Sequence, residues 1–161
     1  HIVTYLGQVS QKALTEDQTK VLVNLMAAAN DLENIGDIIE TDMVYLGNEG
    51  IDAQVSISEE TQEILRKLHD IVTITAELAI DAVIENDQRA AQEVIDMKAD
   101  ISRLMESAAM HETKRLVAEE PNRLAAYTIE MDLIEKLKRI YYFAKRMAKT
   151  VVPEEDSEQA A

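Results

Sequence analysis

The sequence predicts an all-α fold, a long antiparallel up-and-down helical bundle. Apolar residues make up 47% of the 161 residues, but aromatic residues only 4%. A core built from Leu, Ile, Val, Ala and Met suits closely packed helices. Gly occurs four times and Pro twice, too few for the frequent turns of an all-β chain. Strands are therefore not expected, and a chain of this length can bury a core as one domain.

The first long helix is predicted to begin after Thr15. Residues 15–18 read Thr-Glu-Asp-Gln, which is the pattern of a capping box. Apolar side chains then recur every three or four residues over 21–46, and this is the period of an α-helix. Gly47 and Gly50 are expected to end the helix in a left-handed cap. Residues 2–13 are expected to be the end of an earlier helix.

Two further helices follow with similar signals. Ser58 precedes two glutamates and is predicted to start a helix that runs to about Glu85. Asn86 and Asp87 interrupt the pattern, because Asn tolerates the left-handed conformation and Asp caps a new start. Residues 88–118 are therefore predicted to form a separate helix.

The last helix is predicted over residues 123–151. Glu120-Pro121-Asn122 precedes it, and Pro153 is expected to stop it. Helices about 45 Å long that are joined by short connections pack as antiparallel neighbours. We assign residues 1–152 to one bundle and residues 153–161 to a disordered acidic tail.

Charge and composition exclude several classes of function. The formal net charge is -15, and a surface of this sign repels the phosphates of nucleic acids. The chain has no Cys, which excludes disulfides, thiol catalysis and Cys-ligated zinc, and it favours the cytosol. The most apolar stretch, residues 71–84, carries Glu77 and Asp81 and is not expected to cross a membrane. Neither a Gly-rich phosphate loop nor a catalytic triad pattern is present, so no enzyme activity is expected.

A candidate metal site lies within the first long helix. Glu33 and Asp37 stand one turn apart on the same face, where like charges repel each other. Gly36 interrupts the helix interior at a cost of about 1 kcal/mol relative to Ala. A cation bound by the two carboxylates would explain both features. The alternative is a solvated acidic patch beside a tight helix crossing.

The run DLENIGD at residues 31–37 resembles the DLERIGD signature of the PhoU family, phosphate-uptake regulators built from two three-helix repeats. The resemblance implies that Glu33 and Asp37 bind a divalent or iron cation. It also implies that residues 1–50 are the end of a first repeat and that residues 56–152 are a second. In the second repeat the matching run has Glu135 and then Arg139 in place of the second acid, so no metal is expected there.

The chain is most similar to the cytoplasmic PhoU-like domain of bacterial sodium/phosphate cotransporters. This resemblance implies a regulatory domain that modulates phosphate uptake at the cytoplasmic face of the inner membrane. The implied partner is a membrane phosphate transporter, expected in the same polypeptide upstream of His1. A carboxylate-bound metal protein, a plain helical scaffold and a dimerisation module remain open as alternatives, and a homodimer could form through an exposed stripe.

Two other features have two interpretations each. Six basic residues and no acidic one lie over 136–150, namely Lys136, Lys138, Arg139, Lys145, Arg146 and Lys149. They either complement the helix C-terminus and pair with acidic neighbours, or form a docking face for anionic lipid headgroups or a transporter loop.

His111 lies on an apolar stripe and is interpreted as a hydrogen-bonded core residue rather than a metal ligand.

Overall fold

The computed structural model describes residues 2–117 and 122–152. Within these ranges every regular element is a helix and none is a strand, which confirms the all-helical fold class. The elements are α1 (Ile2–Val9), α2 (Glu16–Asp37), the π-helical segment η1 (Ile38–Met43), α3 (Val44–Asp52), α4 (Glu59–Glu85), α5 (Gln88–Asp96), α6 (Lys98–Arg115) and α7 (Arg123–Lys149). The predicted stop at Pro153 and the predicted tail at 153–161 lie outside the described residues.

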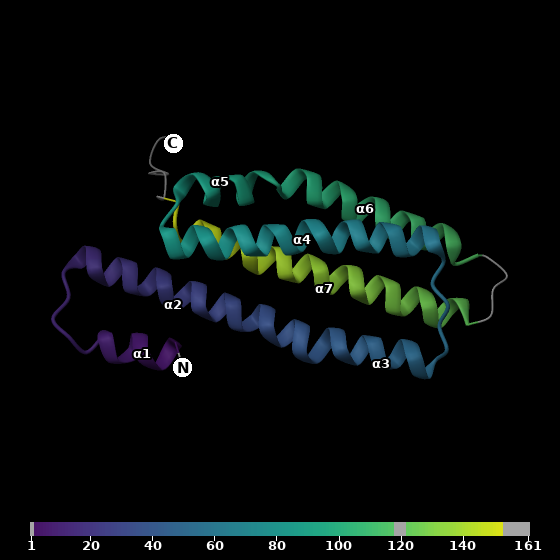
Figure 1. Cartoon of the computed structure of the whole chain (residues 1–161), viewed down its shortest axis with the longest axis horizontal. Helices are drawn as coiled ribbons and strands as arrows, with labels where there is room; N and C mark the ends of the chain where they lie inside the picture. The colour runs from purple at the N-terminus through teal and green to yellow at the C-terminus, as the bar shows by residue number, and fades with distance from the viewer. Residues whose placement is uncertain (1, 118–121, 153–161) are drawn as a thin grey trace, which may run out of the picture.

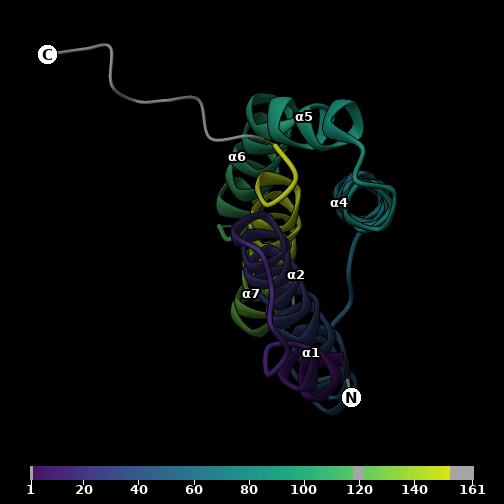
Figure 2. The same cartoon turned by 90° about the vertical axis from the view of Figure 1, so that its left-hand side faces the viewer.

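The elements form a layered bundle with α7 near its centre. Figure 1 shows the chain passing along α2 and α3, returning along α4, passing out again along α5 and α6, and returning along α7. α4, α5 and α6 pack on one another and on α7, while α2, η1 and α3 pack on α7 as an outer layer. Figure 2, which looks along the bundle, shows α1 at the edge of the bundle, next to α2. No helix among the described residues combines the length and apolar character of a membrane span.

The core lies where α4, α5, α6 and α7 meet. Small side chains at these contacts let the helices approach closely. The fully buried apolar residues are Leu68, Ala79, Ala82, Ala91, Val94, Ile101, Ala108, Ala144 and Ala148. The single helix predicted over 88–118 is divided in two at Met97, a turn residue between α5 and α6, and α6 ends at Arg115.

The predicted helix starts are confirmed by their caps. Thr15 Oγ1 accepts a hydrogen bond from the backbone N–H of Gln18, and the Gln18 side chain accepts one from the Thr15 N–H. Ser58 Oγ accepts from the Thr61 N–H at 3.2 Å. Asn86 has a left-handed backbone with φ of 51°, and Asp87 caps α5. Each of these helix starts depends on a cap made by three or four neighbouring residues, so the sequence alone is enough to predict it.

The predicted end of the first long helix is wrong. Gly47 and Gly50 both lie inside α3, neither has a positive φ, and the left-handed residue is Gln54 with φ of 51°. The helix continues because its backbone hydrogen bonds are retained through both glycines, at a modest propensity cost. The stripe also shifts within η1, where Ile38 is 3% exposed and Ile39 is 50% exposed. Ile38 follows the buried Ile35 at an ordinary helical step, and the π-helical turn comes after it, so the next residues packed toward the core are Met43 and Leu46.

Candidate functional site

The DLENIGD run has one buried acid and two exposed ones. Glu33 and Asp37 lie on the solvent face of α2, one turn apart. Asp31 is 2% exposed and faces α7, where Arg146 Nε lies 3.3 Å from its Oδ2. Among residues 2–117 and 122–152, no three His, Asp or Glu side chains converge in the manner of a metal site. Cation binding by Glu33 and Asp37 stays a prediction.

Gly36 does not mark a tight helix crossing. A Cβ built at this position would meet no heavy atom within 4 Å, so nothing in the packing requires a glycine there. The close crossing proposed beside the acidic pair is therefore wrong. The π-helical segment begins two residues later, at Ile38.

A cluster of charged side chains is buried where α6 ends and α7 begins, at one end of the bundle (Figure 1). Glu112, in the last turn of α6, and Glu130, two turns into α7, are both 0% exposed. Arg123, the first residue of α7, is 5% exposed. Charged side chains are almost never this buried unless they are paired, and this cluster is the most unusual polar feature of the fold.

One guanidinium joins the two carboxylates. Arg123 Nη2 donates to Glu130 Oε2 at 2.6 Å and to Glu112 Oε2 at 3.0 Å. Arg123 Nη1 also lies 3.3 Å from Glu130 Oε1, so the Arg123–Glu130 pair uses both terminal nitrogens. Glu112 Oε1 and Arg123 Nε have no hydrogen-bond partner within the described part of the chain. The cluster therefore crosslinks α6 and α7, with part of its hydrogen-bonding capacity unused.

Within the cluster, the pKa of Glu130 is raised toward neutral pH. Burial raises the pKa of Glu130 to about 7, with a further rise from the hydrogen bond to Glu112, against the opposing effect of Arg123. The hydrogen bond to Glu130 raises the pKa of Arg123, so the guanidinium stays charged. A proton on Glu130 reduces the negative charge that is buried beside the Arg123 guanidinium, and this lowers the cost of burying the cluster.

Further polar groups connect the cluster to α4. Arg115 Nη1 donates to Thr61 Oγ1 at 2.6 Å and lies 4.0 Å from Glu130 Oε1. His111 Nε2 lies 3.2 Å from Thr61 Oγ1 and 3.9 Å from Glu112 Oε1. These contacts confirm that His111 is hydrogen-bonded, but the residue is half-buried at the edge of the core and is not fully inside it.

Sequence reasoning found His111 but missed Glu112, Arg123 and Glu130. The signal was their spacing: Glu112 continues the stripe of Ile101, Met105 and Ala108, and Arg123, Ala126 and Glu130 precede Ile134 at steps of three and four. A charged residue at a core position predicts a buried partner.

The basic segment of α7 pairs mainly with the outer layer. Lys136 Nζ lies 2.8 Å from Asp42 Oδ2, and Arg139 Nη1 lies 3.7 Å from the same oxygen. Together with Arg146 and Asp31, these contacts tie α7 to α2 and η1. The interpretation that these cations pair with acidic neighbours is confirmed for these three residues. Lys138 lies 3.8 Å from Glu135 on its own helix.

No family model, curated protein or solved structure matches this chain. The resemblance to the PhoU family therefore stays a prediction from the acidic run at residues 31–37 and the helix pattern.

The buried cluster can hold and exchange a proton, but it does not present these groups to a substrate. Both carboxylates are fully buried, so α6 and α7 would have to separate before a ligand could contact them. Its direct effect is on the stability of the α6–α7 end and on how that stability depends on pH.

Proposed function

We propose that this chain is a non-catalytic regulatory domain, resembling PhoU, that modulates phosphate uptake by contacting a membrane phosphate transporter. The observation that carries the interaction role is the apolar surface of the outer layer. Large apolar side chains that are exposed on α1, α2, η1 and α3 are Ile2, Val3, Tyr5, Val21, Val23, Leu25, Ile39, Val44, Tyr45 and Ile51. Exposed apolar side chains gathered along one layer of a fold favour a protein contact there.

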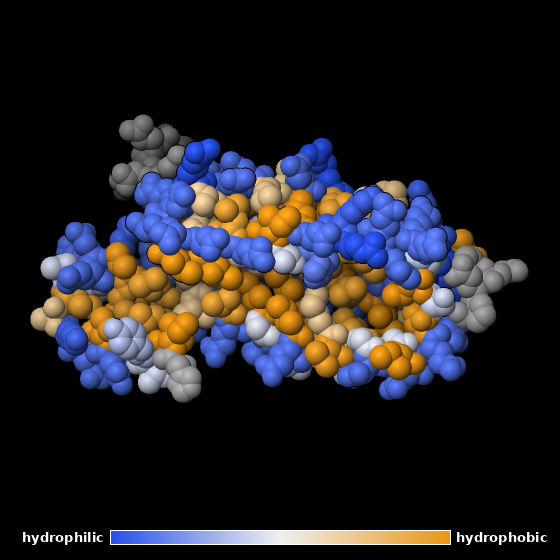
Figure 3. All heavy atoms as spheres, in the orientation of Figure 1, coloured by the Kyte–Doolittle hydropathy of each residue, from blue (hydrophilic) through white to orange (hydrophobic). Residues whose placement is uncertain are grey.

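A groove between α2, α4 and α7 adds to this surface. It has a volume of about 500 Å³ and is lined mainly by apolar residues, among them Leu32, Ile39, Ala76 and Ile80. Figure 3 shows apolar residues gathered along this groove, between α2 and α4. A helix or loop of a partner could bind in this groove and also cover the exposed apolar residues of α3.

The proposal extends to the repeat organisation. α2, η1 and α3 would be the last helix of a first repeat, and α4, α5–α6 and α7 would be the second repeat in an antiparallel PhoU-like arrangement. The course of the chain in Figure 1 supports this order. The transporter would be part of the same polypeptide, upstream of His1, and the domain would lie at the cytoplasmic face of the inner membrane.

The test is phosphate uptake by cells that carry the complete gene. A Tyr45→Glu/Ile51→Glu variant places charge on the exposed apolar surface of α3, and uptake is expected to lose its normal response to external phosphate. The matched control is Ile74→Glu, which changes a 55% exposed apolar residue on α4. Uptake that responds normally in the α3 variant, with the protein present at its usual level, would contradict the proposal.

The metal part of the proposal has its own test. Two exposed carboxylates supply few of the six to eight oxygen ligands of a typical Ca²⁺ site, so the cation would need further ligands from water or a partner. Elemental analysis after incubation with iron, zinc or manganese is expected to show metal in the native chain and less in a Glu33→Gln/Asp37→Asn variant. Equal metal content in the two proteins would remove Glu33 and Asp37 from the proposal.

A further inference from the structure

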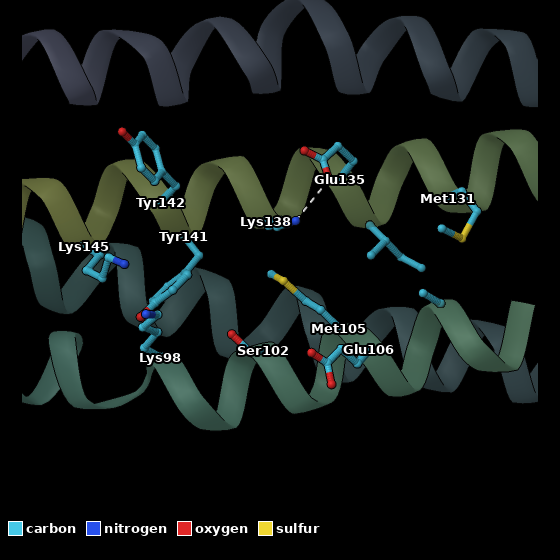
Figure 4. Close-up of a pocket in the computed structure, with 12 residues that line it drawn as sticks. Lys98, Ser102, Met105, Glu106, Met131, Glu135, Lys138, Tyr141, Tyr142 and Lys145 are labelled. Atoms are coloured by element: carbon cyan, nitrogen blue, oxygen red, sulfur yellow. Dashed lines mark ion pairs between the residues drawn. The ribbon is translucent and has the colours of Figure 1, made fainter.

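A groove between α6 and α7 carries an unusual combination of charge and apolar surface. It has a volume of about 500 Å³, within the range of small-molecule sites. Met105, Met131 and Ile134 form much of its apolar lining. Figure 4 shows Lys98, Lys145 and Tyr141 at one end of this groove, with Met131 near the other. The groove is thus cationic at one end, and apolar side chains form part of its lining between the two ends.

The two lysines at the cationic end lack an acidic partner. Among the residues that the structure describes, no ion pair or hydrogen bond is made by Lys98 or Lys145, although the protein carries a net charge of -15. Lys145 is half-buried, and its Nζ lies 5.8 Å from the centre of the Tyr141 ring. Burial lowers the pKa of Lys145, and repulsion from Lys98 and Lys149 adds to this effect. An anion bound here would relieve that repulsion.

Tyr141 supplies a buried hydroxyl without a partner. The residue is 6% exposed, and its Oη makes no hydrogen bond to any described residue. Its ring reaches from α7 toward Lys98, so the hydroxyl points into the cationic end of the groove (Figure 4). A buried hydroxyl normally finds a hydrogen-bond partner. The unpaired Oη therefore points to a ligand that can accept its hydrogen.

The carboxylates of the groove lie away from this end. Glu135 is 3.8 Å from Lys138, and Glu106 lies with it on the Met131 side of Ser102 (Figure 4). An anionic group would therefore be attracted to Lys98 and Lys145 and repelled from the far half.

We propose that this groove binds an amphipathic oxyanion, a phosphate monoester or carboxylate that carries an aliphatic chain. The oxyanion lies between the ammonium groups of Lys98 and Lys145. A small rotation of the Tyr141 side chain brings its buried hydroxyl to the groove surface, where it donates a hydrogen bond to the oxyanion. The chain lies over Met105 and Ile134 toward Met131. The inference comes from the groove alone and does not depend on the role in phosphate uptake.

Calorimetric titration of the whole chain with three probes tests the chemistry. The probes are decyl phosphate below its micelle concentration, inorganic phosphate, and decyltrimethylammonium. Decyl phosphate is expected to bind at least about tenfold more tightly than inorganic phosphate, because several CH₂ groups are buried. The cationic probe, which has the same chain, is expected not to bind.

Variants locate the site. Lys98→Met/Lys145→Met keeps the apolar stems and is expected to weaken decyl phosphate binding at least about tenfold. The matched control, Lys12→Met/Lys67→Met, makes the same change in net charge outside the groove and is expected to bind like the native chain. Tyr141→Phe is expected to weaken binding about twofold to tenfold without lowering the melting temperature, since the hydroxyl has no partner in the free protein.

Three results would overturn the proposal. Binding of decyl phosphate that is unchanged in Lys98→Met/Lys145→Met would place the anion elsewhere. Equal binding of the cationic probe would show that charge plays no part. Equally tight binding of inorganic phosphate would show that the apolar lining plays none. Circular dichroism of each variant establishes that it is folded before its titration is interpreted.

Discussion

Arg123 Nη2 lies 2.6 Å from Glu130 Oε2, and both side chains are buried, with 4% and 0% of their surfaces exposed. The ion pair connects the first turn of α7 to its third, and the shared contact with Glu112 connects it to α6. Removing charges from water is costly. A protein with such a buried pair is therefore little more stable than one in which both partners are replaced by apolar residues. Loss of one partner is different, because the other charge is left buried.

Arg123→Met is therefore expected to destabilise the protein strongly. Glu112 and Glu130 would share a dry site without their cation, and the expected loss in the free energy of unfolding is about 3–5 kcal/mol. Urea denaturation followed by circular dichroism at 222 nm measures it. The control is Arg103→Met, which removes an exposed partner of Asp100 on α6 and is expected to cost at most about 1 kcal/mol. Similar costs for the two variants would contradict the role given to Arg123.

The same cluster is expected to make stability depend on pH. The pKa of Glu130 rises from 4.5 to about 7 in the folded protein, so between these values the folded state holds a proton that the unfolded state has released. The contribution of Glu130 is thus complete below about pH 4.5 and is lost as the pH rises through about 7. Melting temperatures measured from about pH 5 to about pH 8 should fall with this profile.

Glu130→Gln and Glu93→Gln separate this effect from general charge repulsion. Glutamine at 130 stays neutral at every pH and mimics the protonated acid, so the fall in melting temperature should become shallower. Glu93 is exposed on α5, and its replacement makes the same change in net charge without touching the cluster. A slope that is unchanged in Glu130→Gln, or reduced equally in both variants, would exclude Glu130 as the source.

Gly36→Ala is expected to stabilise the protein by about 0.5–1 kcal/mol. The position is helical, and a Cβ there meets nothing within 4 Å, so alanine gains helix propensity without a clash. Urea denaturation measures the change, and Gly47→Ala is a parallel case with the same open surroundings in α3. Destabilisation by Gly36→Ala would indicate that the helix needs a glycine before the π-helical segment.

Much of the fold was predictable because its signals are local. Thr15, Ser58 and Asp87 each cap a helix through groups no more than three residues away, so the sequence shows the start directly. Gly47 and Gly50 were misleading because a glycine ends a helix only when the chain turns there, and that depends on packing against α7. The burial of Ile38 in place of Ile39 has no local signal of this kind, because steps of three and of four residues both fit the helical period.

The buried cluster was not predictable in the same way. Glu112 and Glu130 are separated by the α6–α7 connection, and their approach depends on how two helices align. The Lys98–Lys145 end of the groove is a similar case, since these residues are far apart in the sequence. The exposed pair Glu33 and Asp37 was recognised because it lies on a single helix face.

The Asp31–Arg146 contact gives a final test of how the outer layer is held. Asp31 is 2% exposed and Arg146 is 47% exposed, with 3.3 Å between Oδ2 and Nε. Burial raises the pKa of Asp31 and Arg146 opposes the rise, so the ionised acid is tolerated because of the arginine.

Arg146→Met should therefore destabilise the native chain but have little effect in the presence of Asp31→Asn. A double-mutant cycle with urea denaturation measures the coupling, which is expected to be about 0.5–3 kcal/mol. Since the pKa of Asp31 is raised, its contribution is lost as pH increases, and Asp31→Asn alone should be close to neutral at pH about 7. If Arg146→Met costs the same in the Asp31→Asn variant as in the native chain, the pair does not act as a unit in holding α2 to α7.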